Sequence, residues 1–123
     1  MLLKDFYIIK ELEKISDSKF KVLILVNEKH EIFQGHFPKN PIMPGVCMMQ
    51  IIKELTEQIT NTTLFMESLS NVKFMALINP FVNPELLLEL EILTAEDNVI
   101  KVKNVSYFDE TVALKLSCVY RKL

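Results

Sequence analysis

The chain has 123 residues, of which 50% are hydrophobic and 24% are charged. This length and balance suit one compact domain with a buried core, so we expect a single domain over residues 1–123. The formal net charge is −2, with no block of like charges, which argues against a nucleic-acid partner. The aliphatic runs are far shorter than the ~20 residues of a membrane-spanning helix. We therefore expect no membrane span, no secretory signal and a cytoplasmic location.

The first predicted element is residues 5–15. Its apolar positions suit a short amphipathic helix as well as a strand, and periodicity alone leaves both open. A turn at residues 16–18 follows. Apolar and other residues then alternate over 20–26, which predicts a strand.

Glycine and proline are concentrated in one short segment. Both glycines, Gly35 and Gly45, and three of the five prolines, Pro38, Pro41 and Pro44, fall within eleven consecutive residues. Glycine permits backbone conformations closed to other residues, and proline fixes φ. The segment is therefore expected to be a loop of defined shape.

A long helix is predicted from Gly45 to about Ile59, with Pro44 at its first turn. Apolar residues share one face of this helix, namely Met48, Ile51, Ile52, Leu55 and Ile59. Polar residues share the opposite face, namely Gln50, Lys53, Glu54 and Glu57. An apolar face of this width is expected to pack against a sheet.

The second half of the chain reads as strands. They are expected over residues 71–78, 85–94, 99–108 and 112–121, with turns at 95–98 and 109–111. Strands joined by such short turns form an antiparallel meander. The predicted fold class is α+β, with one long central helix wrapped by an antiparallel β-sheet of five or six strands.

Residues 34–46 read Gln-Gly-His-Phe-Pro-Lys-Asn-Pro-Ile-Met-Pro-Gly-Val. This run resembles the Gly-His-Phe-Pro-x-x-Pro-x-x-Pro-Gly signature of the 3-hydroxyacyl-[acyl carrier protein] dehydratases, which leads into the central helix of a hot-dog fold. The resemblance extends more loosely over residues 19–121. It implies dehydration of a 3-hydroxyacyl thioester to a trans-2-enoyl thioester, with an acyl carrier protein as partner. It also implies a homodimer or a heterodimer with another hot-dog chain, no cofactor and no metal.

The chemistry of such a reaction fits the residues of this segment. Histidine titrates near neutral pH, so His36 is the candidate base for the α-proton. The first N–H groups of a helix lack internal partners, so the amides of Gly45 and Val46 are candidate donors to the thioester oxygen. Phe37 and Pro44 join these two as the expected substrate-binding residues.

The sequence departs from the family at one important position. The resemblance implies an acidic residue fourteen positions after the histidine, where this chain has Gln50. An amide can donate or accept a hydrogen bond, but it has no proton to transfer. We keep Gln50 as the second catalytic candidate, in an orienting role.

Three explanations of Gln50 stay open. Glu54 follows one helical turn later, ~6 Å along the helix, and is a further candidate for substrate binding. A partner chain could supply the acid, or catalysis is lost and acyl binding kept. The alternatives to a dehydratase are thus a non-catalytic acyl-binding subunit that pairs with an active homologue, and a hot-dog thioesterase.

Other residues receive no catalytic role. His30 lacks a motif and is expected at the surface, and Cys47 and Cys118 are expected to be small buried hydrophobes. Flexible thioether side chains could line an acyl site or simply fill the core. They belong to Met43, Met48, Met49, Met66 and Met75.

Overall fold

The computed structural model describes residues 5–33 and 42–123. It contains one α-helix, α1 (Gly45–Thr60), and one short 3₁₀ helix, η1 (Glu31–Phe33). The strands are β1 (Tyr7–Lys14), β2 (Lys19–Val26), β3 (Leu64–Phe74), β4 (Glu85–Ala95), β5 (Val99–Phe108) and β6 (Thr111–Lys122). None of the helices in these residues is long and apolar enough to cross a membrane.

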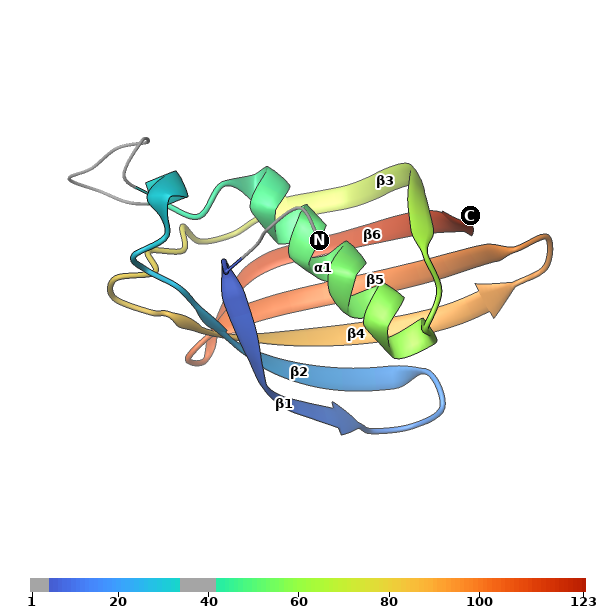
Figure 1. Ribbon diagram of the computed structural model, residues 1–123, viewed down its shortest axis with the longest axis horizontal. Coiled ribbons are helices and arrows are strands. Elements are labelled where there is room, and N and C mark those ends of the chain that lie inside the picture. The colour runs from blue at the N-terminus through green and yellow to red at the C-terminus, as the bar shows by residue number, and fades with distance from the viewer. Residues whose placement is uncertain (1–4, 34–41) are drawn as a thin grey trace.

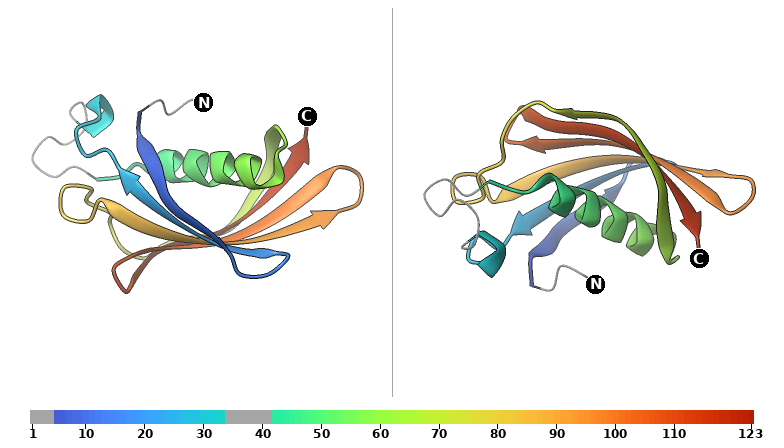
Figure 2. Two further views of the ribbon diagram at one scale, coloured as in Figure 1. Left: turned by 60° about the horizontal axis from the view of Figure 1, so that its bottom comes forward. Right: turned by 90° about the horizontal axis from the view of Figure 1, so that it is seen from above.

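The six strands form one sheet in the order β1-β2-β4-β5-β6-β3, and every neighbouring pair is antiparallel. Helix α1 lies along one face of this sheet (Figure 1). Figure 2 shows that the strands curve around the helix, with the two edge strands on opposite sides of it. The predicted α+β arrangement of one helix and an antiparallel sheet is confirmed.

Most element predictions agree with the structure. The helix begins at Gly45 as expected and ends one residue after Ile59. The strands β4, β5 and β6 lie within one residue of their predicted bounds. The ambiguity over residues 5–15 is resolved as a strand, because β1 pairs with β2 from Tyr7 opposite Val26 to Lys14 opposite Phe20.

The prediction of a strand over residues 71–78 is wrong in its bounds, because only residues 71–74 lie in a strand. Strand β3 begins at Leu64, almost directly after the helix, and ends at Phe74. Its register against β6 shifts twice, and Asn71 has a φ of 53°. These irregularities break the alternation of apolar and polar residues, which is the signal that a sequence offers for a strand.

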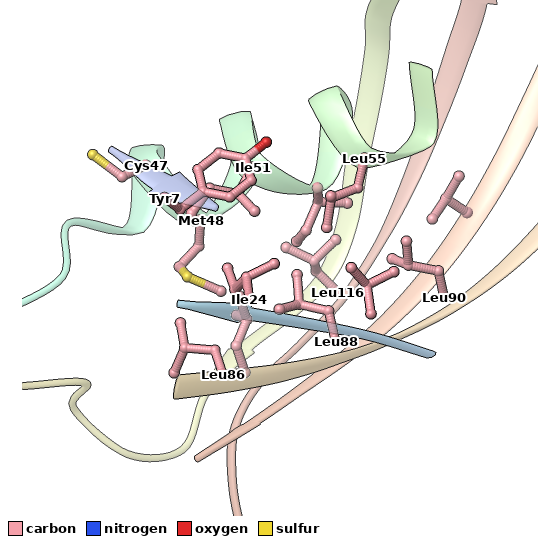
Figure 3. Packing of buried hydrophobic residues seen from close by; sticks show 14 of the residues in the cluster. Tyr7, Ile24, Cys47, Met48, Ile51, Leu55, Leu86, Leu88, Leu90 and Leu116 are labelled. Carbon is pink, nitrogen blue, oxygen red and sulfur yellow. The ribbon is translucent and has the colours of Figure 1, made fainter. Parts of the chain in front are cut away.

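The core lies between α1 and the concave face of the sheet. Met48, Ile51 and Leu55 are at most 1% exposed, and Figure 3 shows them pointing toward strand residues such as Leu88 and Leu116. Each such side chain contributes about 1.5–3 kcal/mol when it is removed from water. The predicted apolar face of the helix is therefore the face that holds α1 against the sheet.

Strand β4 offers a direct test of this core. Leu90 is 1% exposed, whereas Leu93 on the same strand is 45% exposed. We expect Leu90→Ala to lower the free energy of unfolding by about 2–5 kcal/mol, because the core cannot close over the lost volume. Leu93→Ala is the matched control, with an expected change below about 1 kcal/mol. Urea unfolding measures both, and equal effects would contradict the burial pattern.

Tyr120 carries a buried hydroxyl group within the core. Its side chain is 0% exposed, and its hydroxyl finds no hydrogen-bond partner among the described residues. Burial raises the pKa of this hydroxyl, and the neighbouring Cys118 thiol acts in the same direction. A buried hydroxyl without a strong partner lowers stability.

Removal of that hydroxyl should therefore stabilise the protein. We expect Tyr120→Phe to raise the free energy of unfolding by about 1 kcal/mol, because the ring stays packed and only the unpaired oxygen is lost. Tyr107, whose hydroxyl bonds to Glu89 near the surface, gives the control variant Tyr107→Phe. A clear loss of stability in Tyr120→Phe, measured by thermal unfolding, would mean that the hydroxyl has a partner after all.

Candidate functional site

The predicted catalytic His36 and the neighbouring Phe37 lie in residues 34–41, outside the described part of the chain. Their roles stay predictions from the sequence. The structure describes the residues on either side of this segment, where η1 ends and where α1 begins. These flanks fix where the segment starts and ends.

Both flanks are tied into the core. Phe33 is 2% exposed, and its ring stacks on that of Phe6 with 5.4 Å between the ring centres. Met43 is 5% exposed, and its N–H donates to the carbonyl oxygen of Ile78 at 2.8 Å. The described residues on both sides of the segment that includes His36 are therefore anchored in the core.

His30 differs from the prediction of a surface residue. Its ring is half-buried and meets the edge of Phe6 at 5.1 Å between centres. Its Nδ1 accepts a hydrogen bond from the N–H of Ile32 at 3.1 Å, which supports the start of η1. This role has no local sequence signal, because the residues that the His30 ring contacts lie on two separate segments.

The N-terminal end of α1 follows Pro44, which is in an extended conformation. Among the described residues, no side chain caps this end. A Cβ atom at Gly45 would lie 2.7 Å from Cζ of Phe74, so glycine lets this aromatic ring approach the helix closely. The side chain of Val46 is 72% exposed. The first N–H groups of α1 carry the partial positive charge of a helix N-terminus, which suits a polarised carbonyl oxygen.

Gln50 lies in a small hydrogen-bonded group. Its Nε2 donates to Oε2 of Glu54 at 2.9 Å, and the hydroxyl of Tyr7 donates to Oε1 of the same carboxylate at 2.9 Å. Burial, and then the hydrogen bond to Glu54, raise the pKa of Tyr7 well above its ordinary range, so Tyr7 keeps its proton. Figure 3 shows the Tyr7 ring against the first turns of α1, with its oxygen directed away from the sheet. Glu54 thus joins the helix to the edge strand β1.

Members of this group line two open hollows. One, of about 550 Å³, is polar and is lined by Gln50, Lys53, Glu54, Glu57, Gln58, Asn61, Thr62 and Thr63. The other, of about 620 Å³, is more apolar and includes Tyr7, Ile8 and Leu25 in its lining. The hydrogen bond between Tyr7 and Glu54 thus joins a residue of the apolar hollow to a residue of the polar one.

The cysteines and methionines considered in the sequence differ in their burial. Cys47 and Cys118 are buried as predicted, and burial raises the pKa of both thiols. Met43 and Met48 belong to the core, whereas Met75 is 57% exposed. In residues 5–33 and 42–123, no three His, Cys, Asp or Glu side chains are arranged to hold a metal ion.

Tyr7 is the residue of this group that the sequence did not reveal. It lies 47 positions before Glu54, in a segment whose secondary structure was ambiguous. A lone tyrosine carries no motif, so only the packing of β1 beside α1 could identify it.

Solved structures with a similar fold include two enzymes. The dehydratase heterocomplex ApeI:P from Xenorhabdus doucetiae has a TM-score of 0.75 at 19% identity, over 93% of this chain and 96% of that one. A mutant thioesterase from Pseudomonas aeruginosa has a TM-score of 0.64 at 11% identity, over 99% of this chain and 84% of that one. At these identities the likeness concerns the fold, and the predicted hot-dog fold is confirmed.

Sequence comparison narrows the family. A 3-hydroxyacyl-[acyl-carrier-protein] dehydratase FabZ from Caulobacter vibrioides is 31% identical over 99 residues, which cover 73% of this chain. The chain spans about 60% of the length of that curated relative. The family model described as ApeI-like, ApeI dehydratase, matches residues 11–112. Since this match covers most of the sequence, the chain belongs to the ApeI-like dehydratase family.

Proposed function

We propose that this protein removes water from 3-hydroxyacyl thioesters carried by an acyl carrier protein, in the cytoplasm, and forms trans-2-enoyl thioesters. Membership of a dehydratase family and the similarity to FabZ support this reaction. The observation that carries the proposal is the anchoring of the two flanks of residues 34–41, which include His36. Phe33 before this segment and Met43 after it are buried, and α1 begins two residues after Met43.

This placement suits elimination next to a thioester. His36 takes the proton from the α-carbon, and the electron pair of that C–H bond forms the new double bond. The amides of Gly45 and Val46 donate hydrogen bonds to the thioester oxygen, where negative charge develops. The bond between the β-carbon and the hydroxyl breaks, and the imidazolium of His36 returns its proton to the departing hydroxyl, which leaves as water.

Gln50 takes part without moving a proton. Its side chain can hold the 3-hydroxyl of the substrate by a hydrogen bond. Glu54 is a poor replacement for the missing acid, because both of its oxygens accept hydrogen bonds from Gln50 and Tyr7. The proposed route therefore returns the proton through His36 rather than through a second acid.

A second candidate function is a subunit that binds acyl groups and works beside an active homologue. The structure of a dehydratase heterocomplex from Xenorhabdus doucetiae gives a precedent for two different chains together. The edge strand β3 offers a place for a second hot-dog chain, since Phe65 and Phe74 on it are each 57% exposed. In that arrangement the partner supplies the acid that Gln50 lacks.

Hydration of a trans-2-enoyl-acyl carrier protein, the reverse reaction, tests the two candidates. The purified protein is incubated alone, and the loss of enoyl absorbance is followed. Conversion by the wild type supports the enzyme. No conversion alone, with conversion after addition of a second hot-dog chain that co-purifies, supports the subunit. No conversion in either case contradicts both.

A further inference from the structure

Both hydrogen bonds around Glu54 point toward its carboxyl group, from the hydroxyl of Tyr7 and from Nε2 of Gln50. An ionised carboxylate accepts hydrogen bonds and donates none. Tyr7 keeps its proton, so its hydroxyl is the donor to Oε1 of Glu54. The amide of Gln50 must then turn its NH₂ group toward Oε2. A rotated amide would place two acceptor oxygens against each other.

This constraint determines which atom Gln50 offers to a ligand. With Nε2 on Glu54, Oε1 lies on the other side of the amide. Gln50 itself lies in the second turn of α1, one helical turn before Glu54. The N–H groups of Gly45 and Val46, which have no acceptor within the helix, lie about one turn before Gln50.

Tyr7 is fixed in position by core packing, by strand pairing and by its hydrogen bond to Glu54. Its ring is 9% exposed and belongs to the hydrophobic core, while its hydroxyl reaches the carboxylate. It lies on β1, which is fixed by its pairing with β2. The position of Glu54 is thus set from outside the helix, and that of Gln50 is set by Glu54.

We propose that Tyr7 and Glu54 are positioning residues that hold the Gln50 amide with Oε1 as a hydrogen-bond acceptor for the 3-hydroxyl of the substrate. This inference rests on the proposed function, because it assumes a 3-hydroxyacyl ligand at the start of α1. It makes Gln50 a residue that selects hydroxylated acyl chains. Glu54 then acts through Gln50 and does not transfer a proton.

Calorimetric titration with two ligands tests the inference. The probes are 3-hydroxyoctanoyl-pantetheine and octanoyl-pantetheine, which differ only in the hydroxyl. We expect the wild type to bind the hydroxylated probe about tenfold more tightly, as one well-placed hydrogen bond allows. Gln50→Ala should remove this preference and leave the Kd of octanoyl-pantetheine unchanged.

The variants Tyr7→Phe and Glu54→Gln test the positioning role. Each should reduce the preference for the hydroxylated probe at least about threefold, because the Gln50 amide is free to rotate. In a Gln50→Ala background, neither should change the preference further. Tyr107→Phe, which removes another tyrosine hydroxyl bonded to a glutamate, Glu89, is the matched control and should keep the wild-type preference.

The possible failures are distinct. A wild type without preference, variants that keep the preference, or equal losses of affinity for both probes would overturn the positioning role. If the preferences change as expected but no enoyl thioester is hydrated, the positioning role stands and the proposed catalysis fails.

Discussion

His36→Ala should lower the rate of enoyl thioester hydration by about 10²- to 10⁴-fold, which is the usual loss when a general acid or base is removed. The effect is expected to be at the upper end, because the proposed route uses this imidazole for both proton transfers. Stability should change little, because the glycine- and proline-rich sequence around His36 predicts a loop. Initial rates at saturating substrate and a urea titration measure the two quantities.

The chain contains a matched control for this variant. His30 is the other of the two histidines in the chain. Its ring packs against Phe6 and accepts a hydrogen bond from the N–H of Ile32. His30→Ala should therefore lower stability by about 1–3 kcal/mol and leave the rate per folded molecule unchanged. If the two variants lose activity equally, His36 has no special role.

Gln50→Glu should produce the largest change in pH dependence. It places a second carboxyl group where Gln50 now lies 2.9 Å from Glu54. Two carboxylates at this distance cannot both ionise freely, so the pKa of the introduced carboxyl rises above about 4.3, its ordinary value. The folded protein then retains a proton that the unfolded chain releases. The free energy of unfolding should therefore fall as the pH rises through this range, by up to about 1.4 kcal/mol per pH unit.

The same substitution should change activity. A carboxyl that keeps its proton at mildly acidic pH can protonate a departing hydroxyl, so we expect a gain of about 10²-fold there, lost as the pH rises. Gln58→Glu is the control, since it adds the same charge one turn beyond Glu54 at an exposed position. Rate profiles and unfolding curves across pH check both effects. A flat stability profile in Gln50→Glu would mean that the two side chains are not held together.

The helix and the meander were predictable because their apolar residues follow regular periods. Leu86, Leu88 and Leu90 alternate along β4 and all face the core, and the apolar face of α1 follows the helical period. Strand β3 was misplaced because its pairing with β6 is irregular and Asn71 interrupts it. A regular pattern is visible in a sequence, whereas a bulge depends on the neighbouring strand.

The site was predictable only in part. Pro44 and Gly45 mark the helix start through their backbone preferences, and the motif around His36 identifies the family. The placement of Gln50 and Glu54 on one polar helix face also followed from the helical period, and their hydrogen bond agrees with it. The contact of Tyr7 with Glu54 did not, because it joins residues 47 positions apart through the packing of an edge strand. Long-range contacts of this kind have no local sequence signal.

The intact mass of a 3-hydroxyacyl-acyl carrier protein, recorded before and after incubation with the protein, distinguishes dehydration from thioester hydrolysis and from binding alone. A dehydratase removes one water and leaves the thioester bond intact, so we expect a fraction of the carrier to become lighter by the mass of one water. That fraction should be absent with His36→Ala. Release of the whole acyl group would indicate a thioesterase, and an unchanged mass would indicate a protein that only binds. Either result would contradict the proposal that this protein dehydrates 3-hydroxyacyl thioesters.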